Sequence, residues 1–233
     1  MPKPYTPNDK WARKAKEEGF RARSIYKLQE LDEKFQLLHP GMIVLDLGAA
    51  PGSWLQYVSG KIGPKGLAIG LDLQKIEKIA PNVVTLEQDI MDLDAVEKIV
   101  HEVMGARAQG RKGATSSESS DSSRSGPEGP SGPRTAASSE SFLIDLLLSD
   151  AAPSTSGIHD VDQWRSIELN QSALAIGKRL LKPGGRCVLK VFQGADFDPF
   201  IKDVRSEWKD VHIIKAKTSR DRSTEVYVIA QKA

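Results

Sequence analysis

The 233-residue chain contains few of the residues that build disulfides, metal sites or membrane spans. Its single cysteine, Cys187, excludes an internal disulfide and a cysteine-based zinc site. The four histidines are scattered without the spacing of metal ligands, so we expect no bound metal. No apolar run approaches the roughly 18 residues that a membrane span needs, and the N-terminal segment has no signal-peptide core. We therefore expect a cytoplasmic protein that does not contact a membrane.

Charge is present in quantity but is unevenly distributed. The composition, 39% hydrophobic and 27% charged with a net charge of +2, is that of a globular protein. Residues 1–28 nevertheless carry eight Lys or Arg against three acidic residues, and Lys215, Lys217, Arg220 and Arg222 repeat the bias near the C-terminus. Two basic segments that bracket the rest of the chain favour a polyanionic partner.

Strand and helix patterns alternate along most of the sequence. The patterns predict strands at 42–47, 67–72, 82–86, 143–149, 186–192, 211–214 and 224–230, and helices at 22–38, 53–60, 93–103, 162–181 and 197–208. Such alternation predicts an α/β fold with a mainly parallel sheet covered by helices on both faces. The connection between the last two strands is too short for a crossover helix, so the last strand should be antiparallel.

Residues 105–141 differ from the rest because they are rich in Ser, Gly, Pro, Thr and Ala and have almost nothing to bury. We interpret them as a disordered insertion between the helix ending near Met104 and the strand beginning near Phe142. The expected organisation is therefore a basic helical segment at 1–40 and a main domain at 41–233, interrupted at about 105–141.

The string DLGAAPGSW, residues 46–54, predicts a pocket for a nucleotide-type cofactor. A short apolar strand gives way to the small residues 48–52, and a helix then begins at Ser53, which is a good N-cap. A turn of small residues lets the backbone approach a ligand closely. The string is not the G-x-G-x-x-G pyrophosphate fingerprint, so a dinucleotide is disfavoured.

Further candidate residues fall at the ends of other predicted strands. In open α/β sheets ligands bind at the carboxyl ends of the strands, where an acidic residue can accept hydrogen bonds from a ribose diol. Asp72 occupies that position after the second strand, and Asp89 could accept from an adenine amino group. Asp150 and Lys190 place an acid and an amine at the ends of two later strands. The predicted cofactor-binding set is Gly48, Gly52, Trp54, Asp72, Asp89 and Asp150.

These strings resemble the FtsJ family of S-adenosylmethionine-dependent RNA 2′-O-ribose methyltransferases, particularly its bacterial members that act on large-subunit ribosomal RNA. The resemblance covers nearly everything outside 105–141 and is carried by ARSIYKL, VLDLGAAPGSWLQYV, LSDAAP, GGRCVLKVFQG and STEVYV. It implies a Rossmann-like methyltransferase fold with a seven-stranded sheet. It also implies S-adenosylmethionine as cofactor and methylation of a 23S rRNA uridine, free or within the large ribosomal subunit. We expect the chain to act as a monomer.

The resemblance also implies a catalytic tetrad of two lysines and two acids. The family's tetrad corresponds to Lys27, Asp150, Lys190 and Glu225 in this chain. Lys190 is expected to be the general base, and Lys27 to steer the ribose hydroxyl. Asp150 would hold the lysine and contact the cofactor, while Glu225 would fix Lys27 or the ribose. One departure from the family pattern is Ala151, which stands where the family more often has Met.

Three alternatives remain at this point. A tRNA 2′-O-methyltransferase of the same superfamily is disfavoured, because those enzymes tend to carry Cys in place of Gly48 and an SDGAPD string. An RNA-binding protein without activity would not need an intact tetrad. A nicotinamide dehydrogenase would need the missing pyrophosphate fingerprint.

Overall fold

The computed structural model describes residues 10–115, 143–153, 156–219 and 223–233. Within these residues seven strands form one sheet in the order β3-β2-β1-β4-β5-β7-β6. The strands are β1 (Ile43–Leu47), β2 (Leu67–Asp72), β3 (Val83–Glu87), β4 (Ile144–Ser149), β5 (Leu181–Phe192), β6 (Lys209–Ile214) and β7 (Glu225–Gln231). The helices are α1 (Lys10–Glu17), α2 (Ile25–Phe35), α3 (Ser53–Ile62), α4 (Leu93–Thr115), α5 (His159–Leu180) and α6 (Phe197–Glu207).

The direction of the strands confirms the predicted fold class. Strands β3, β2, β1, β4 and β5 run parallel, whereas β7 pairs antiparallel with both β5 and β6. The order of the strands reverses between β1 and β4, because the chain leaves β1 toward one edge and β4 toward the other. In open α/β sheets a ligand crevice forms at this reversal, beyond the carboxyl ends of the strands.

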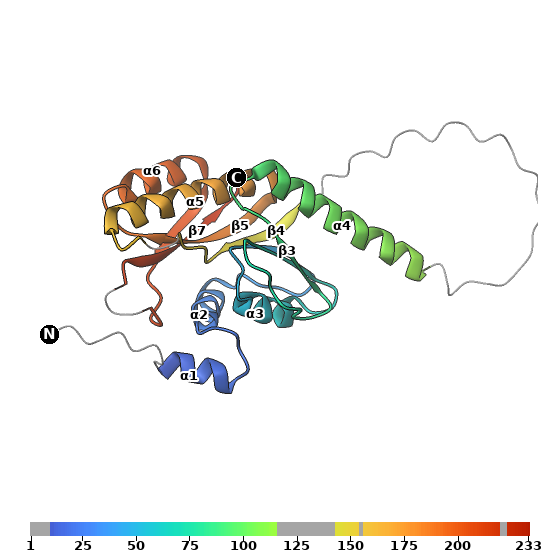
Figure 1. Ribbon diagram of the computed structural model, residues 1–233. Helices are drawn as coiled ribbons and strands as arrows, with labels where there is room; N and C mark the ends of the chain where they lie inside the picture. The colour runs from blue at the N-terminus through green and yellow to red at the C-terminus, as the bar shows by residue number, and fades with distance from the viewer. Residues whose placement is uncertain (1–9, 116–142, 154–155, 220–222) are drawn as a thin grey trace, which may run out of the picture.

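Helices cover both faces of the sheet, as Figure 1 shows. Side chains alternate between the two faces of a strand, so each strand supplies both layers of the core. Leu45 and Leu47 of β1 pack into the layer that contains α4, α5 and α6 residues. Val44 of the same strand packs into the other layer, together with Leu28 of α2 and Leu55 of α3. Within the described residues no helix is both long and apolar enough to cross a bilayer.

Helix α4 is longer than the sequence predicts. It continues to Thr115 rather than ending at 103, so its last turns occupy the first residues of the predicted insertion at 105–141. The guanidinium of Arg107 explains part of this difference, since it donates hydrogen bonds to the carbonyl oxygens of Pro64, Lys65 and Gly66. The remainder of the predicted insertion, 116–141, lies outside the described residues.

Strand β5 begins at Leu181 rather than at the predicted residue 186. The Gly184 N–H donates to Lys232 O, and the Lys232 N–H donates to Gly185 O, so the C-terminal end of the chain pairs with this segment. Gly184 has a φ of 77°, and the β4–β5 register shifts between Ile144 and Leu146. The first residues of β5 therefore form an irregular part of the sheet.

Candidate active site

A cavity of about 340 Å³ opens at the carboxyl ends of the strands, next to the reversal in strand order. Its walls come from the loops after β1, β2, β3 and β4 and from Leu169 of α5. Four of the six predicted cofactor-binding residues line it: Gly48, Asp72, Asp89 and Asp150. Its volume lies within the usual range of small-molecule sites.

The loop after β1 packs closely against Ala151 and donates a backbone hydrogen bond to Asp72. A Cβ atom at Gly48 would lie 2.6 Å from the Cβ of Ala151, and the glycine has a φ of 72°, so only glycine fits there. The Asp72 carboxylate accepts the Ala50 N–H at 2.9 Å and the Gln74 N–H at 2.8 Å. These contacts fix the position of the Asp72 carboxylate at the cavity wall.

Gly52 and Trp54 lie behind this loop, in the contact between α3 and the N-terminal segment. A Cβ atom at Gly52 would lie 2.7 Å from Ile79 Cδ1 and 3.0 Å from Arg21 Nη1. The indole of Trp54 is buried, and its Nε1 donates to the Ser24 carbonyl oxygen at 2.9 Å. Direct contact of these two residues with a cofactor stays a prediction. The hydrogen bond of Trp54 to Ser24 fixes the start of α2 against α3.

The four predicted tetrad residues form two buried ion pairs on the α2–α3 face of the sheet. Lys27 Nζ lies 2.5 Å from Glu225 Oε1, which also accepts a hydrogen bond from the Ser219 hydroxyl at 3.0 Å. Lys190 Nζ lies 3.2 Å from Asp150 Oδ1 and donates to the Asp150 carbonyl oxygen at 2.5 Å. Lys27, Lys190 and Glu225 are each only 8% exposed. The structure therefore brings together four side chains that are up to 198 positions apart.

Tyr227, which the sequence analysis did not single out, connects the two ion pairs. Its hydroxyl donates to Asp150 Oδ1 at 2.9 Å, and Lys27 Nζ lies 5.8 Å from its ring centroid. It is also the direct cross-strand partner of Lys190. Burial, followed by the negative charges of Asp150 and Glu225, raises the pKa of Tyr227 well above its ordinary value. The phenol therefore stays protonated and acts as a hydrogen-bond donor.

Asp46 of β1 is the first residue of the predicted cofactor string, but the sequence analysis assigned it no role. Its side chain is 1% exposed, and neither carboxylate oxygen has a hydrogen-bond partner among the described residues. Burial raises the pKa of Asp46 well above its ordinary value, and the nearby carboxylates of Asp150 and Asp72 raise it further. Buried polar groups without partners are rare, so this carboxyl group calls for an explanation.

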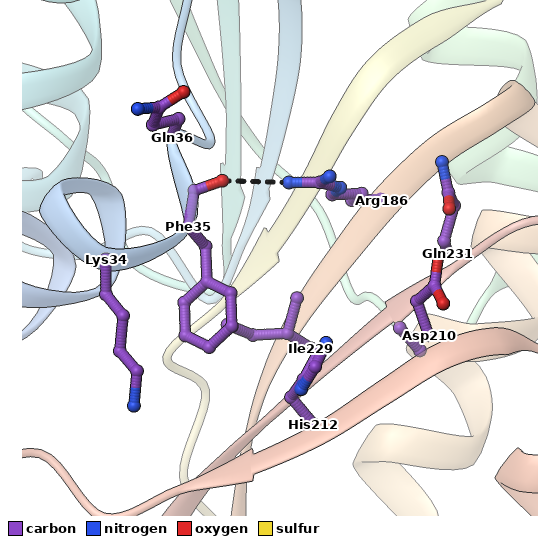
Figure 2. Close-up of a pocket in the computed structure, with 9 residues that line it drawn as sticks. Lys34, Phe35, Gln36, Arg186, Asp210, His212, Ile229 and Gln231 are labelled. Carbon is purple, nitrogen blue, oxygen red and sulfur yellow. Dashed lines mark hydrogen bonds between the residues drawn. The ribbon is translucent and has the colours of Figure 1, made fainter.

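Another cavity, of about 290 Å³, lies at the opposite end of the sheet. Figure 2 shows Arg186 directed at the backbone of Phe35, where its Nη1 donates to the carbonyl oxygen at 2.9 Å. The Phe35 and His212 rings lie 5.2 Å apart at its wall. Its lining residues include none of the predicted site residues, so the candidate active site is the cavity beside Asp150.

Comparisons with known proteins agree with the family resemblance seen in the sequence. The family model described as FtsJ-like methyltransferase matches residues 20–233. The chain is 39% identical over 224 residues to ribosomal RNA large subunit methyltransferase E of Methanothrix thermoacetophila, covering 96% of this chain and 72% of that protein. It is 37% identical over 229 residues to the protein of the same name from Syntrophobacter fumaroxidans, covering 98% and 97%.

Solved structures show the same fold. A crystal structure titled as a ribosomal RNA methyltransferase from Plasmodium falciparum superimposes with a TM-score of 0.67 at 23% identity, covering 91% of this chain and 98% of that one. A structure titled as an rRNA methylase from Clostridium thermocellum gives a TM-score of 0.52 at 14% identity, covering 89% and 97%. At these identities the similarity establishes the fold alone.

Proposed function

The chain belongs to the FtsJ-like methyltransferase family, and on that premise we propose that it transfers a methyl group from S-adenosylmethionine to a ribose 2′-hydroxyl of large-subunit ribosomal RNA, at a uridine. Relatives that the chain covers almost completely carry the name of a large-subunit rRNA methyltransferase. The observation that carries the proposal is the position of Asp150, which both lines the cavity and pairs with the buried Lys190.

The residues of the cavity fit a cationic nucleoside donor. Asp72 would accept hydrogen bonds from the ribose diol, Asp89 from the adenine amino group, and Asp150 would lie near the sulfonium. Gly48 leaves room for the backbone to approach the donor, while Gly52 and Trp54 would complete its contacts. The donor supplies a methyl group already activated by the positive charge on sulfur.

The buried amines would orient the ribose hydroxyl and accept its proton. We assign Lys190 as the general base, because it lies beside Asp150 at the cavity wall. To accept the hydroxyl proton, Lys190 must offer a free lone pair on Nζ. Lys27, fixed by Glu225, would donate a hydrogen bond to the ribose oxygen and hold it in line. Orientation of this kind can lower a barrier by about 7–11 kcal/mol, and a positioned base adds about 10²–10⁴-fold in rate.

The N-terminal basic segment would guide the RNA to this site. Helix α1 carries Lys10, Lys14 and Lys16 close to α2, which supplies Lys27. The α1 side chain of Trp11 packs against Tyr26 of α2, with ring centroids 5.1 Å apart, so the basic helix is anchored to the tetrad-bearing helix. Phosphate contacts from such a helix provide affinity but little sequence information. The 2′-hydroxyl as acceptor requires RNA rather than DNA.

A transfer assay with two classes of RNA tests the proposal. The purified chain is incubated with methyl-labelled S-adenosylmethionine and unmodified transcripts of large-subunit rRNA or tRNA, and large ribosomal subunits serve as a third substrate. We expect label in the rRNA or in the subunits. Label confined to tRNA would show instead the tRNA enzyme of the same superfamily. RNA binding without label transfer to any substrate would show a binding protein on the methyltransferase scaffold.

A further inference from the structure

Asp46 has no assigned role in the methyl transfer proposed above. The residue lies in the centre of the sheet, where β1 pairs with β2 and β4, and its register partners are Gly70 and Leu148. By strand alternation it shares the face of Val44, which packs into the α2–α3 layer. Tyr227 of β7 packs into the same layer. Lys190 of β5 faces it too, because it lies two residues after Val188, which packs there. Asp46 thus lies under the same polar cluster as the tetrad.

The charged and titratable groups around this layer leave Asp46 without a cation of its own. Lys190 is paired with Asp150, and Lys27 is paired with Glu225. Tyr227 directs its hydroxyl at Asp150, and Asp72 accepts two backbone N–H groups. In the described part of the chain no side chain forms an ion pair or hydrogen bond with the Asp46 carboxyl group. An isolated ionised carboxylate at such a place would be strongly unfavourable.

We propose that Asp46 binds a proton in the free protein and releases it when the sulfonium donor enters the adjacent cavity. The carboxyl group loses its proton to solvent and becomes the counter-charge of the donor cation. After methyl transfer the donor is a neutral thioether, and the carboxylate takes a proton back from solvent. Asp46 is therefore a positioning residue that distinguishes the charged donor from the neutral product. This inference rests on the proposed function, because it requires that S-adenosylmethionine occupies the cavity.

The physical basis is the difference in charge between donor and product. S-Adenosylmethionine and S-adenosylhomocysteine share the adenosine and the amino-acid group, so hydrogen bonds from Asp72 or Asp89 contribute alike to both. Only the sulfonium charge differs. A buried carboxylate close to the site interacts with that charge through a medium that screens it weakly, whereas a water-exposed one would not.

Calorimetric titration without RNA measures this effect apart from catalysis. S-Adenosylmethionine and S-adenosylhomocysteine are titrated into the protein at about pH 6, where an ordinary aspartate with a pKa of about 3.9 holds no proton. Two buffers of different ionisation enthalpy give the number of protons released. The variants are Asp46→Asn and, as a matched control, Asp210→Asn. Asp210 is an exposed carboxylate at the opposite end of the sheet, and asparagine tolerates the left-handed backbone conformation of this position.

We expect the wild-type protein and Asp210→Asn to release more protons with the donor than with the product. Asp46→Asn should abolish this difference, weaken donor binding about tenfold and change product binding less than threefold. Equal proton release for donor and product in the wild type, or an unchanged difference in Asp46→Asn, would overturn the inference and leave the proposed function intact. Absence of any donor binding by the wild type would overturn both.

A second measurement covers the case in which Asp46→Asn does not fold. The affinity of the wild-type protein for the donor should rise from about pH 5 to about pH 8 more steeply than its affinity for the product, since ionisation of Asp46 is needed only by the cation. Parallel pH profiles for the two ligands would contradict the inference.

Discussion

Replacement of Lys190 by methionine separates the catalytic assignment of this residue from its structural role. Methionine keeps the length of the side chain but removes the amine and its charge. The change leaves the Asp150 carboxylate with the Tyr227 hydroxyl and without the cation now 3.2 Å away. If Lys190 is the general base, the rate of methyl transfer should fall by about 10²–10⁴-fold.

The same change has a cost in stability that can be anticipated from burial. The Lys190 and Asp150 side chains are 9% and 19% exposed, so the pair is largely shielded from water. Removal of one member of a buried pair destabilises a protein by about 3–5 kcal/mol, and the partial exposure of Asp150 favours the lower end. A loss of about 3 kcal/mol should lower the Tm by about 6–12 °C in a chain of this size. The double variant Lys190→Met/Asp150→Asn should recover most of this loss but none of the activity.

Three assays on the Lys190 variants check this reasoning. Single-turnover transfer at saturating donor and RNA reports the chemical step, calorimetry reports donor affinity, and thermal unfolding reports stability. Donor affinity of Lys190→Met should stay within about threefold of the wild type, because a loss of binding would mean a general collapse of the site. A single-turnover rate within tenfold of the wild type would refute the general-base assignment.

Four further predictions follow from the contacts around the cavity. Asp72→Ala should weaken donor and product binding together, by at least tenfold in calorimetry, since both ligands share the ribose; selective loss of one ligand would argue against ribose contact. Tyr227→Phe removes the hydrogen bond to Asp150 and should slow methyl transfer by about 5–30-fold. It should also lower the free energy of unfolding by about 1–2 kcal/mol in denaturant titrations, and wild-type values in both assays would show that this hydrogen bond is unimportant. Asp46→Asn should raise the Tm of the ligand-free protein at neutral pH. The pKa of Asp46 is raised in the folded state, so its ionisation costs stability as pH rises above the unfolded value of about 3.9. The Tm advantage of Asp46→Asn should therefore shrink toward that pH, and an advantage independent of pH would exclude a buried ionisable group. Raising salt from about 50 to about 200 mM should weaken RNA binding at least tenfold in a filter-binding assay while donor affinity changes little; equal salt dependence of both would exclude phosphate contacts as the source of RNA affinity.

The sheet and its order of elements could be predicted from the sequence because their signals are local. Strands β1, β2, β4 and β7 are short runs rich in β-branched and aliphatic residues, and their boundaries lie within one residue of the predicted ones. The extension of α4 could not be predicted in this way. It accompanies contacts of Arg107 with the backbone around Gly66, about 40 positions away, and no periodicity reveals such a contact.

The site was predictable to the extent that its residues carry charge at strand ends. Asp150 stands out as an acid directly after an apolar strand and Lys190 as an amine within one, whereas Lys27 on a basic helix required the family resemblance. Tyr227 was missed because a tyrosine in a strand is an ordinary core residue, although its spacing from Glu225 places both on one face. Asp46 belongs to the predicted cofactor string but was assigned no role, because its significance lies in the absence of a partner among the described residues, which only coordinates reveal.

The position of the transferred methyl group tests the central claim most directly. RNA labelled by the purified chain is digested to nucleosides, and the labelled product is identified by mass spectrometry against standards. A ribose-methylated nucleoside, 2′-O-methyluridine, is the predicted product, and Lys190→Met should form it at a rate lower by at least two orders of magnitude. Label on a base, with an unmodified ribose, would contradict the account, because the two lysines and two acids would then serve a different acceptor.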